Sequence, residues 1–343
     1  MKMRTCVHVL SAVLALTGCR SIGPSAIRRG HADFNGAIAQ TLDEQLLLNV
    51  VRARYLEPAF FLDVGNVTDS RRVALNVGTD DSVVYVHNHG RTSEWNPTAN
   101  FELSQNPSVV YLPLQGQRLV KQLAAPVPLP VLLNAVQSGW SVRRVFGIFV
   151  ERMGNLSNAP SASGPTPVRM PEWVDFSRSL ALMESLVRGG VLTLDVDPAD
   201  SGRLAPRLDS DSRLAVAAAE CRDLLDLPSD GRTGSVRLRT RSMQSTLFFL
   251  ANGVQIPKDH QDKGIVPITR TATGDAFDWT SVLEGQFTVR CSPHRPTDAF
   301  LAVPYRGHWF FIADWDLDTK STFLLLMNTF NLQAGDPALA ISR

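Results

Sequence analysis

Cys291 and His294 form a Cys-x-x-His arrangement at the end of an apolar segment. A thiolate beside an imidazole is a competent nucleophile, and Pro293 places the pair in a loop, where catalytic groups often lie. No sequence signature of a protease or a transpeptidase flanks the pair. A cysteine that is buried or disulfide-bonded is therefore the favoured interpretation, and nucleophilic catalysis is the alternative.

His87 and His89 are the residues that suggest a metal ion. In a strand they would lie on one face, because side chains alternate with a period of two. A third ligand from elsewhere in the fold would complete a zinc site. The sequence shows no third ligand at a recognisable spacing, such as His-Glu-x-x-His. Two solvated histidines are therefore favoured, and neither a metal ion nor another cofactor is predicted.

Arg237, Arg239 and Arg241 occupy alternate positions of a predicted strand. Alternation would place them on one face, about 7 Å apart. Three like charges on one face require anionic groups beside them. These groups are either Asp and Glu residues of a neighbouring strand or an anionic envelope ligand such as lipopolysaccharide or peptidoglycan. The ladder of ion pairs is favoured, because it needs no ligand.

Cys221 and Cys291 are the two cysteines of the chain body. Cys221 lies on the apolar face of a predicted helix, and Cys291 lies on the apolar face of a predicted strand. They either form a disulfide bond between the helix and the sheet or remain two buried free thiols. Their spacing in the sequence does not decide between these alternatives.

A long amphipathic helix is predicted over residues 33–57, with Asp33 as its N-cap and Pro58 directly after it. Its apolar residues form a face broad enough to contact more than one neighbour. The face is either in the core or at a subunit interface, and the core is favoured. The row consists of Phe34, Ile38, Leu42, Leu46 and Val50.

The remaining elements predict an α+β fold, in which a mainly antiparallel sheet packs against helices. Residues 59–112 contain β-branched and aromatic runs separated by Gly, Asn and Asp, which predicts several short strands. Helices are predicted over 116–125 and 130–140, whereas 141–153 is either a strand or a short helix, and the strand is favoured. Near the C-terminus a hairpin is predicted to turn at Arg306-Gly307.

Residues 154–171 are rich in Gly, Ser and Pro, which predicts a linker or a long surface loop. We take this segment as the boundary between two regions. The predicted organisation is a signal peptide at 1–18, a lipidated tether at 19–32, an N-terminal α+β region at 33–153, the linker at 154–171, a C-terminal α+β region at 172–333, and a tail at 334–343.

The first twenty residues have the pattern of an export signal. Lys2 and Arg4 precede about eleven apolar residues, fewer than the roughly 20 that span a bilayer. The string Leu16-Thr17-Gly18-Cys19 then resembles the lipobox of bacterial lipoproteins. The resemblance implies cleavage before Cys19, transfer of diacylglycerol to its thiol, and acylation of the new amino group. The alternative is an ordinary signal peptide that contains a cysteine by chance.

Arg20 bears on the destination of the chain. In enterobacterial lipoproteins an Asp at this position favours retention in the inner membrane, so by resemblance Arg20 indicates the outer membrane, facing the periplasm. Several acyl chains on one cysteine make a firm anchor. The body of the chain resembles uncharacterised lipoproteins of Gram-negative bacteria.

Composition excludes several classes of protein. An apolar content of 44% indicates a globular chain with a core. The net charge is +1, and loss of Lys2 and Arg4 with the signal brings it to about −1, which gives no support for nucleic-acid binding. The sequence contains no Gly-rich phosphate loop, Gly-x-Ser-x-Gly elbow or Ser-x-x-Lys motif.

These observations favour a non-catalytic lipoprotein that is anchored in the outer membrane through Cys19. It would act as a binding, scaffolding or assembly subunit of the cell envelope, with an envelope protein, peptidoglycan or lipopolysaccharide as its partner. The alternative is a lipid-anchored hydrolase of an envelope polymer, with Cys291 and His294 or the His87/His89 pair in its site.

Overall fold

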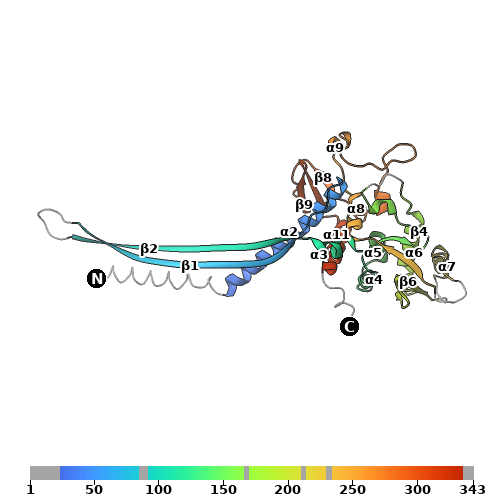
Figure 1. The fold of residues 1–343 in the computed structure, drawn as a ribbon, viewed down its shortest axis with the longest axis horizontal. Coiled ribbons are helices and arrows are strands. Elements are labelled where there is room, and N and C mark those ends of the chain that lie inside the picture. Colours follow the sequence, from blue (N-terminus) through green and yellow to red (C-terminus); the bar gives the residue numbers. More distant parts are fainter. Residues whose placement is uncertain (1–23, 85–91, 166–169, 210–213, 229–233, 335–343) are drawn as a thin grey trace. The chain divides into compact units, whose positions relative to one another are not determined.

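The computed structural model describes residues 24–84, 92–165, 170–209, 214–228 and 234–334, and Figure 1 labels many of their helices and strands. The chain divides into two compact units. Unit 1 comprises residues up to Phe60 and from Gln115 onward, and unit 2 comprises Phe61–Leu114. Among the described residues, no helix has the length and apolar character needed to cross a membrane.

Unit 2 is a single antiparallel ribbon of two strands, β1 (Leu62–Val84) and β2 (Thr92–Pro113). The register runs from Leu62 opposite Pro113 to Val84 opposite Thr92, with one irregularity between Val64 and Val67. The prediction of β structure is confirmed here, but the prediction of several short strands is wrong. The described Gly, Asn and Asp residues of this segment lie within the ladder of β1 and β2 and do not end a strand.

Helix α2 (Pro24–Arg54) opens the described part of unit 1. The predicted helix is confirmed, but it begins at Pro24 rather than after Asp33, so the segment expected to be an extended tether is helical from residue 24. Proline is well suited to the first helical position, because its φ is already helical and its missing N–H is not needed there. The C-terminal half supplies the core, where Leu46, Leu47, Val50 and Val51 are buried.

A five-stranded antiparallel sheet with the order β4-β3-β7-β6-β5 forms one part of unit 1. Its strands are β3 (Val150–Met153), β4 (Leu156–Ser157), β5 (Leu192–Asp197), β6 (Asp200–Leu208) and β7 (Val236–Thr240). The helices of this part are α3 (Gly116–Leu119), a π-helical turn at Val120–Ala124, α4 (Leu129–Gln137), α5 (Val142–Phe149), α6 (Val174–Arg188), α7 (Ala215–Leu224) and α8 (Met243–Ala251). Together they confirm the α+β class, with antiparallel sheets.

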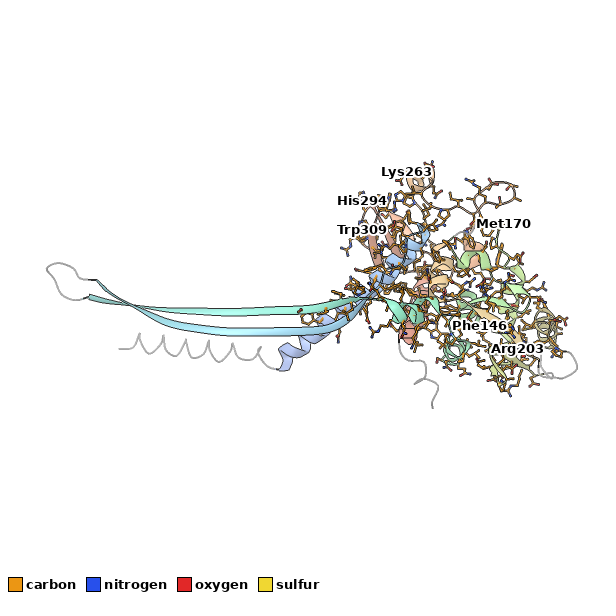
Figure 2. All side chains as sticks on the ribbon, in the orientation of Figure 1. Phe146, Met170, Arg203, Lys263, His294 and Trp309 are labelled. Carbon is orange, nitrogen blue, oxygen red and sulfur yellow. The ribbon has the colours of Figure 1, made fainter. Side chains whose placement is uncertain are left out.

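Helix α5 corrects the expectation of a strand over 141–153. The Ser141 side chain accepts a hydrogen bond from the Arg144 N–H and so caps the helix. Val142, Val145, Phe146 and Phe149 are buried, which is the spacing of a helix face (Phe146 is labelled in Figure 2). The strand begins only at Val150.

A three-stranded antiparallel sheet with the order β8-β10-β9 forms the other part of unit 1. Its strands are β8 (Arg290–Ser292), β9 (Ala299–Tyr305) and β10 (His308–Ala313), and α9 (Lys258–Asp262), α10 (Thr280–Leu283) and α11 (Leu317–Ala334) accompany it in the sequence. The predicted turn at Arg306-Gly307 is confirmed. Both residues have positive φ, 48° and 82°, as a two-residue turn of type I′ requires.

Residues 154–171 do not separate two units, because the chain on both sides belongs to unit 1. The segment contains β4 and a 3₁₀ turn at Pro160–Ser163. Its Asn158, Ala159 and Ala162 are buried. Asn158 also donates hydrogen bonds to the carbonyl oxygens of Gly147 and Val150, both at 2.7 Å. These contacts attach to the core a segment whose composition suggested a linker.

Candidate functional site

Asp259, His260 and His308 form the one group of potential metal ligands found among the described residues of unit 1. One ligand atom from each lies within 4.8 Å of the other two. Asp259 and His260 belong to the short helix α9, and His308 is the first residue of β10. Figure 2 labels Lys263, which follows α9, and Trp309, which follows His308.

Local structure places these side chains. The two-residue turn sets His308 opposite Tyr305 in the hairpin of β9 and β10. Pro257 precedes α9, and its carbonyl accepts the N–H of His260 at 3.0 Å. Tyr55 lies in the turn that ends α2, where its N–H binds the carbonyl of Arg52 at 2.9 Å. Three segments far apart in the sequence therefore meet at one point.

The imidazole of His260 is held from one side by Tyr55. The Tyr55 hydroxyl lies 2.7 Å from Nδ1 of His260, and both side chains are buried. The opposite nitrogen, Nε2, faces Oδ2 of Asp259 at 3.6 Å. Nε2 of His308 faces Oδ1 of the same carboxylate at 3.8 Å. Both separations are longer than a hydrogen bond.

The surroundings of the cluster favour a neutral His260 and an ionised Asp259. Burial lowers the pKa of His260, which keeps its ring neutral at neutral pH. Desolvation raises the pKa of Asp259, but the hydrogen bond from the Lys263 ammonium and the favourable electrostatic effect of this ammonium and the two neighbouring imidazoles together outweigh it. The net pKa of Asp259 is therefore below its ordinary value. Burial raises the pKa of Tyr55, so its hydroxyl stays protonated.

A second layer of contacts fixes the turn beside the cluster. Arg306 donates a hydrogen bond to Glu57 at 2.7 Å, and its guanidinium lies over the rings of Tyr55 and Tyr305 at 5.3 and 5.6 Å. Such contacts offset the backbone strain of a non-glycine residue at positive φ. Tyr55 also packs edge-on against Phe310. The turn and the end of α2 therefore hold each other in place.

The structure has Cys221 and Cys291 as free thiols and not as a disulfide bond, but only Cys221 is buried, as the second predicted alternative required of both. Cys221 is fully buried in α7, and burial raises its pKa to about 11. Cys291 is half-buried at the centre of β8 and lines a pocket of about 490 Å³ with Gln261 and Trp279.

The Cys291/His294 pair does not have the geometry or the acidity of a catalytic dyad. No hydrogen bond joins the thiol to the His294 ring within the described chain, and His294 is exposed in the loop after β8 (Figure 2). Burial and the nearby Asp259 charge raise the pKa of Cys291. A nucleophilic cysteine requires the opposite shift.

The three arginines of the predicted ladder do not share one environment. Arg237 and Arg239 are exposed on β7, where they approach Asp200 of β6 at 3.5 Å and Glu151 of β3 at 3.6 Å. Arg241 lies beyond the end of the strand and is only 1% exposed. The shared anion-binding face is therefore absent, and ion pairs to neighbouring strands account for Arg237 and Arg239.

Arg241 is instead a buried structural residue. Its guanidinium donates hydrogen bonds to Ser163 Oγ at 2.9 Å and to the carbonyl oxygens of Ile148 at 2.9 Å and Val150 at 3.0 Å. It also binds the carbonyl of Asn158 and lies 3.8 Å from the centre of the Phe249 ring. Burial lowers its pKa to about 9, so it is still a cation at neutral pH.

Two groups of predicted site residues, Cys19 and the His87/His89 pair, lie outside the described residues. The cluster of Asp259, His260 and His308 was not predicted from the sequence. His260 and His308 are 48 residues apart and match no metal motif. The available signals were an Asp-His pair just after a proline and a histidine directly after a hairpin turn, and both are common without any function.

Comparison of this chain with protein-family models, with curated proteins and with solved structures finds no match.

Proposed function

We propose that this chain is an envelope lipoprotein that assembles with other copies of itself through the β1/β2 ribbon. The observation that carries the proposal is the ribbon itself. Its strands have 23 and 22 residues, against an average of about five or six for a strand. A strand of that length extends over about 75 Å.

A ribbon of two strands is a marginal structure by itself, because three or more strands or a packed helix are needed for independent stability. Within the described residues no further strand pairs with β1 or β2. Each outer edge therefore presents a row of backbone N–H and C=O groups, which is a template for another strand. A second copy supplies a matching edge of the same length.

The register also gives the ribbon an apolar and a polar set of positions. Apolar residues are paired at alternate positions in its middle, and the positions between them carry mostly polar residues. The apolar pairs are Val73 with Leu103, Leu75 with Phe101, and Val77 with Ala99; the intervening pairs are Ala74 with Glu102, Asn76 with Asn100, and Gly78 with Thr98. Alternation of this kind is typical of a sheet with one buried face.

The same apolar character continues to the end of β2. Val110, Tyr111 and Leu112 are consecutive, and each is more than 40% exposed. Because side chains alternate between the faces of a strand, Tyr111 continues the odd-numbered apolar positions of β2, and Val110 and Leu112 belong to the opposite set. The envelope location is supported by the export pattern and the lipobox resemblance at Cys19. The anchor would concentrate copies on one membrane surface and so favour their assembly.

The alternative, a lipid-anchored hydrolase, has less support. The raised pKa of Cys291 and its lack of a bond to His294 disfavour a cysteine nucleophile. The His87/His89 pair lies outside the described residues. We therefore propose an assembly subunit of the outer membrane that faces the periplasm. These residues have no catalytic role in this proposal.

The experiment measures the assembly state of the full chain in detergent by sedimentation velocity. Leu75→Lys with Phe101→Lys should dissociate the assembly, because it places charges among the apolar positions. Asn76→Lys with Asn100→Lys is the matched control, with the same charges on the alternate positions, and should leave the assembly intact. A monomeric unmodified chain would contradict the proposal, as would equal effects of both double variants.

The anchor is tested separately in cells. Fatty-acid labelling and membrane fractionation should show a labelled chain in the outer-membrane fraction, and Cys19→Ala should remove the label and release the chain. Retention of Cys19→Ala in the membrane would argue against a lipid anchor.

A further inference from the structure

We propose that Asp259, His260 and His308 bind one divalent transition-metal ion of the zinc class. The proposal goes beyond the assembly function and rests on unit 1 alone. It starts from the distances within the cluster, where the facing atoms are 3.6 and 3.8 Å apart.

These distances suit ligands of one ion better than partners in a hydrogen bond. Zinc binds imidazole nitrogen and carboxylate oxygen at about 2.0–2.2 Å, so two ligands of a tetrahedral ion are about 3.4 Å apart. The two facing distances involve different oxygens of the Asp259 carboxylate. One ligand atom from each residue lies within 4.8 Å of the other two, so the three atoms must approach one another by at most about 1.4 Å to reach that separation. Neither pair is close enough for a hydrogen bond.

The orientation of His260 fits this role. The Tyr55 hydroxyl occupies the Nδ1 side of the ring at 2.7 Å and leaves Nε2 directed toward Asp259. Histidine ligands are commonly arranged in this way, with the second nitrogen bound to an outer group that fixes the tautomer and the ring plane. The ring is buried and cannot swing away. This half of the site is therefore ordered before any ion arrives.

His308 is the less constrained ligand. Its Nδ1 is buried without a hydrogen-bond partner in the described part of the chain, and its Nε2 is 3.8 Å from Asp259. Neither nitrogen is therefore engaged in a hydrogen bond. The two imidazole rings are arranged edge to face with their centres 5.0 Å apart. His308 can thus reach the same ion as His260 without competing for its place.

The donor set identifies the class of ion. Two imidazole nitrogens and one carboxylate suit zinc and its transition-metal neighbours, whereas calcium and magnesium prefer oxygen ligands alone. Three protein ligands leave at least one coordination position free, and the Asp259 side chain is 48% exposed, so solvent reaches that position. A site of this type holds a water molecule or a ligand from a partner, unlike a closed four-ligand structural site.

The experiment titrates Zn²⁺ into the full chain in detergent against a chromophoric chelator, after all metal has been removed. Binding of one equivalent is expected. His308→Ala and Asp259→Asn should each weaken the affinity more than about 100-fold, since changes to the outer groups of metal sites alone cost about 10–100-fold. Co²⁺ provides a second readout, because its visible absorption bands report nitrogen and oxygen ligation and should be lost in both variants.

Two controls separate this site from other histidines. His294→Ala removes an exposed histidine of the same region, and the pair His87→Ala with His89→Ala removes the site suggested by the sequence. Both should leave the affinity unchanged. Asp259 is largely exposed, so Asp259→Asn should keep the fold, and thermal unfolding of the metal-free proteins verifies this. The proposal is overturned if no equivalent of Zn²⁺ binds, or if His308→Ala and Asp259→Asn bind it as tightly as the unmodified chain.

Discussion

The hydroxyl of Tyr55 lies 2.7 Å from Nδ1 of His260 and thereby determines which nitrogen of the ring faces Asp259. Tyr55 ends a helix near the start of the described chain, and His260 lies about 200 residues later. The contact therefore joins two distant segments and orients a potential metal ligand at the same time.

Tyr55→Phe should lower the affinity for Zn²⁺ by about 10- to 100-fold while His260 remains in place. The ring would still pack against Phe310, so the loss of stability should be about 1–3 kcal/mol, the cost of leaving the buried Nδ1 of His260 without its partner. Chelator competition measures the first effect, and urea unfolding measures the second. Tyr305→Phe is the control, because its hydroxyl does not contact either histidine. Unchanged Zn²⁺ affinity in Tyr55→Phe would show that the tyrosine has no orienting role.

Lys263→Ala should strengthen Zn²⁺ binding by up to about fivefold, which corresponds to roughly 1 kcal/mol. The Lys263 ammonium donates to Oδ2 of Asp259 at 3.2 Å and so competes with a cation for the same carboxylate. The same chelator titration measures the change. Lys258→Ala serves as the comparison, because Lys258 is a neighbouring charge in α9 that makes no hydrogen bond or ion pair with Asp259 among the described residues. A weaker affinity in Lys263→Ala would mean that the ammonium supports the site.

Arg241→Met should lower the free energy of unfolding by about 3 kcal/mol or more, since several buried carbonyl groups lose their donor at once. Arg239→Met is the matched control, because Arg239 is exposed on β7. It should lower the free energy of unfolding by less than about 1 kcal/mol. Denaturant unfolding gives both values. Because Arg241 attaches residues 158–163 to the core, limited proteolysis of Arg241→Met should cut within 154–171. Equal stabilities of the two variants would be incompatible with this account.

Glu57→Gln should change the pH dependence of stability. The hydrogen bonds from Tyr305 and Arg306 lower the pKa of Glu57 in the folded chain from its ordinary value of 4.5. A carboxyl whose pKa is lowered by folding stabilises the protein above its unfolded-state pKa, and this contribution is lost as the pH falls through the folded-state pKa.

Glu57 is partly exposed, so the difference between the parent and Glu57→Gln at neutral pH should be below about 1 kcal/mol. It should shrink as the pH falls below 4.5 and vanish once the pH is below the folded-state pKa of Glu57. Urea unfolding of both proteins across this range measures the difference. A difference that stays constant with pH would mean that the carboxylate charge does not contribute.

The sequence by itself determined the features that depend on local chemistry. Helix α2 could be predicted from the spacing of Leu46, Val50 and their neighbours, because a helix face repeats every 3.6 residues. The hairpin of β9 and β10 could be predicted from its strands and a glycine in the turn. The α+β class follows from the same patterns. The lipobox resemblance at Cys19 also needs no tertiary structure.

Tertiary structure alone determined which polar side chains are buried and which of them lie close together. Arg241 shares the alternation of Arg237 and Arg239, but β7 ends at Thr240 and Ser242 caps α8, so the chain turns and carries Arg241 into the core. The metal-ligand cluster forms only because α9 and the β9/β10 turn pack against the end of α2. Burial and long-range packing are properties of the whole chain, and no local pattern encodes which distant residues they bring together.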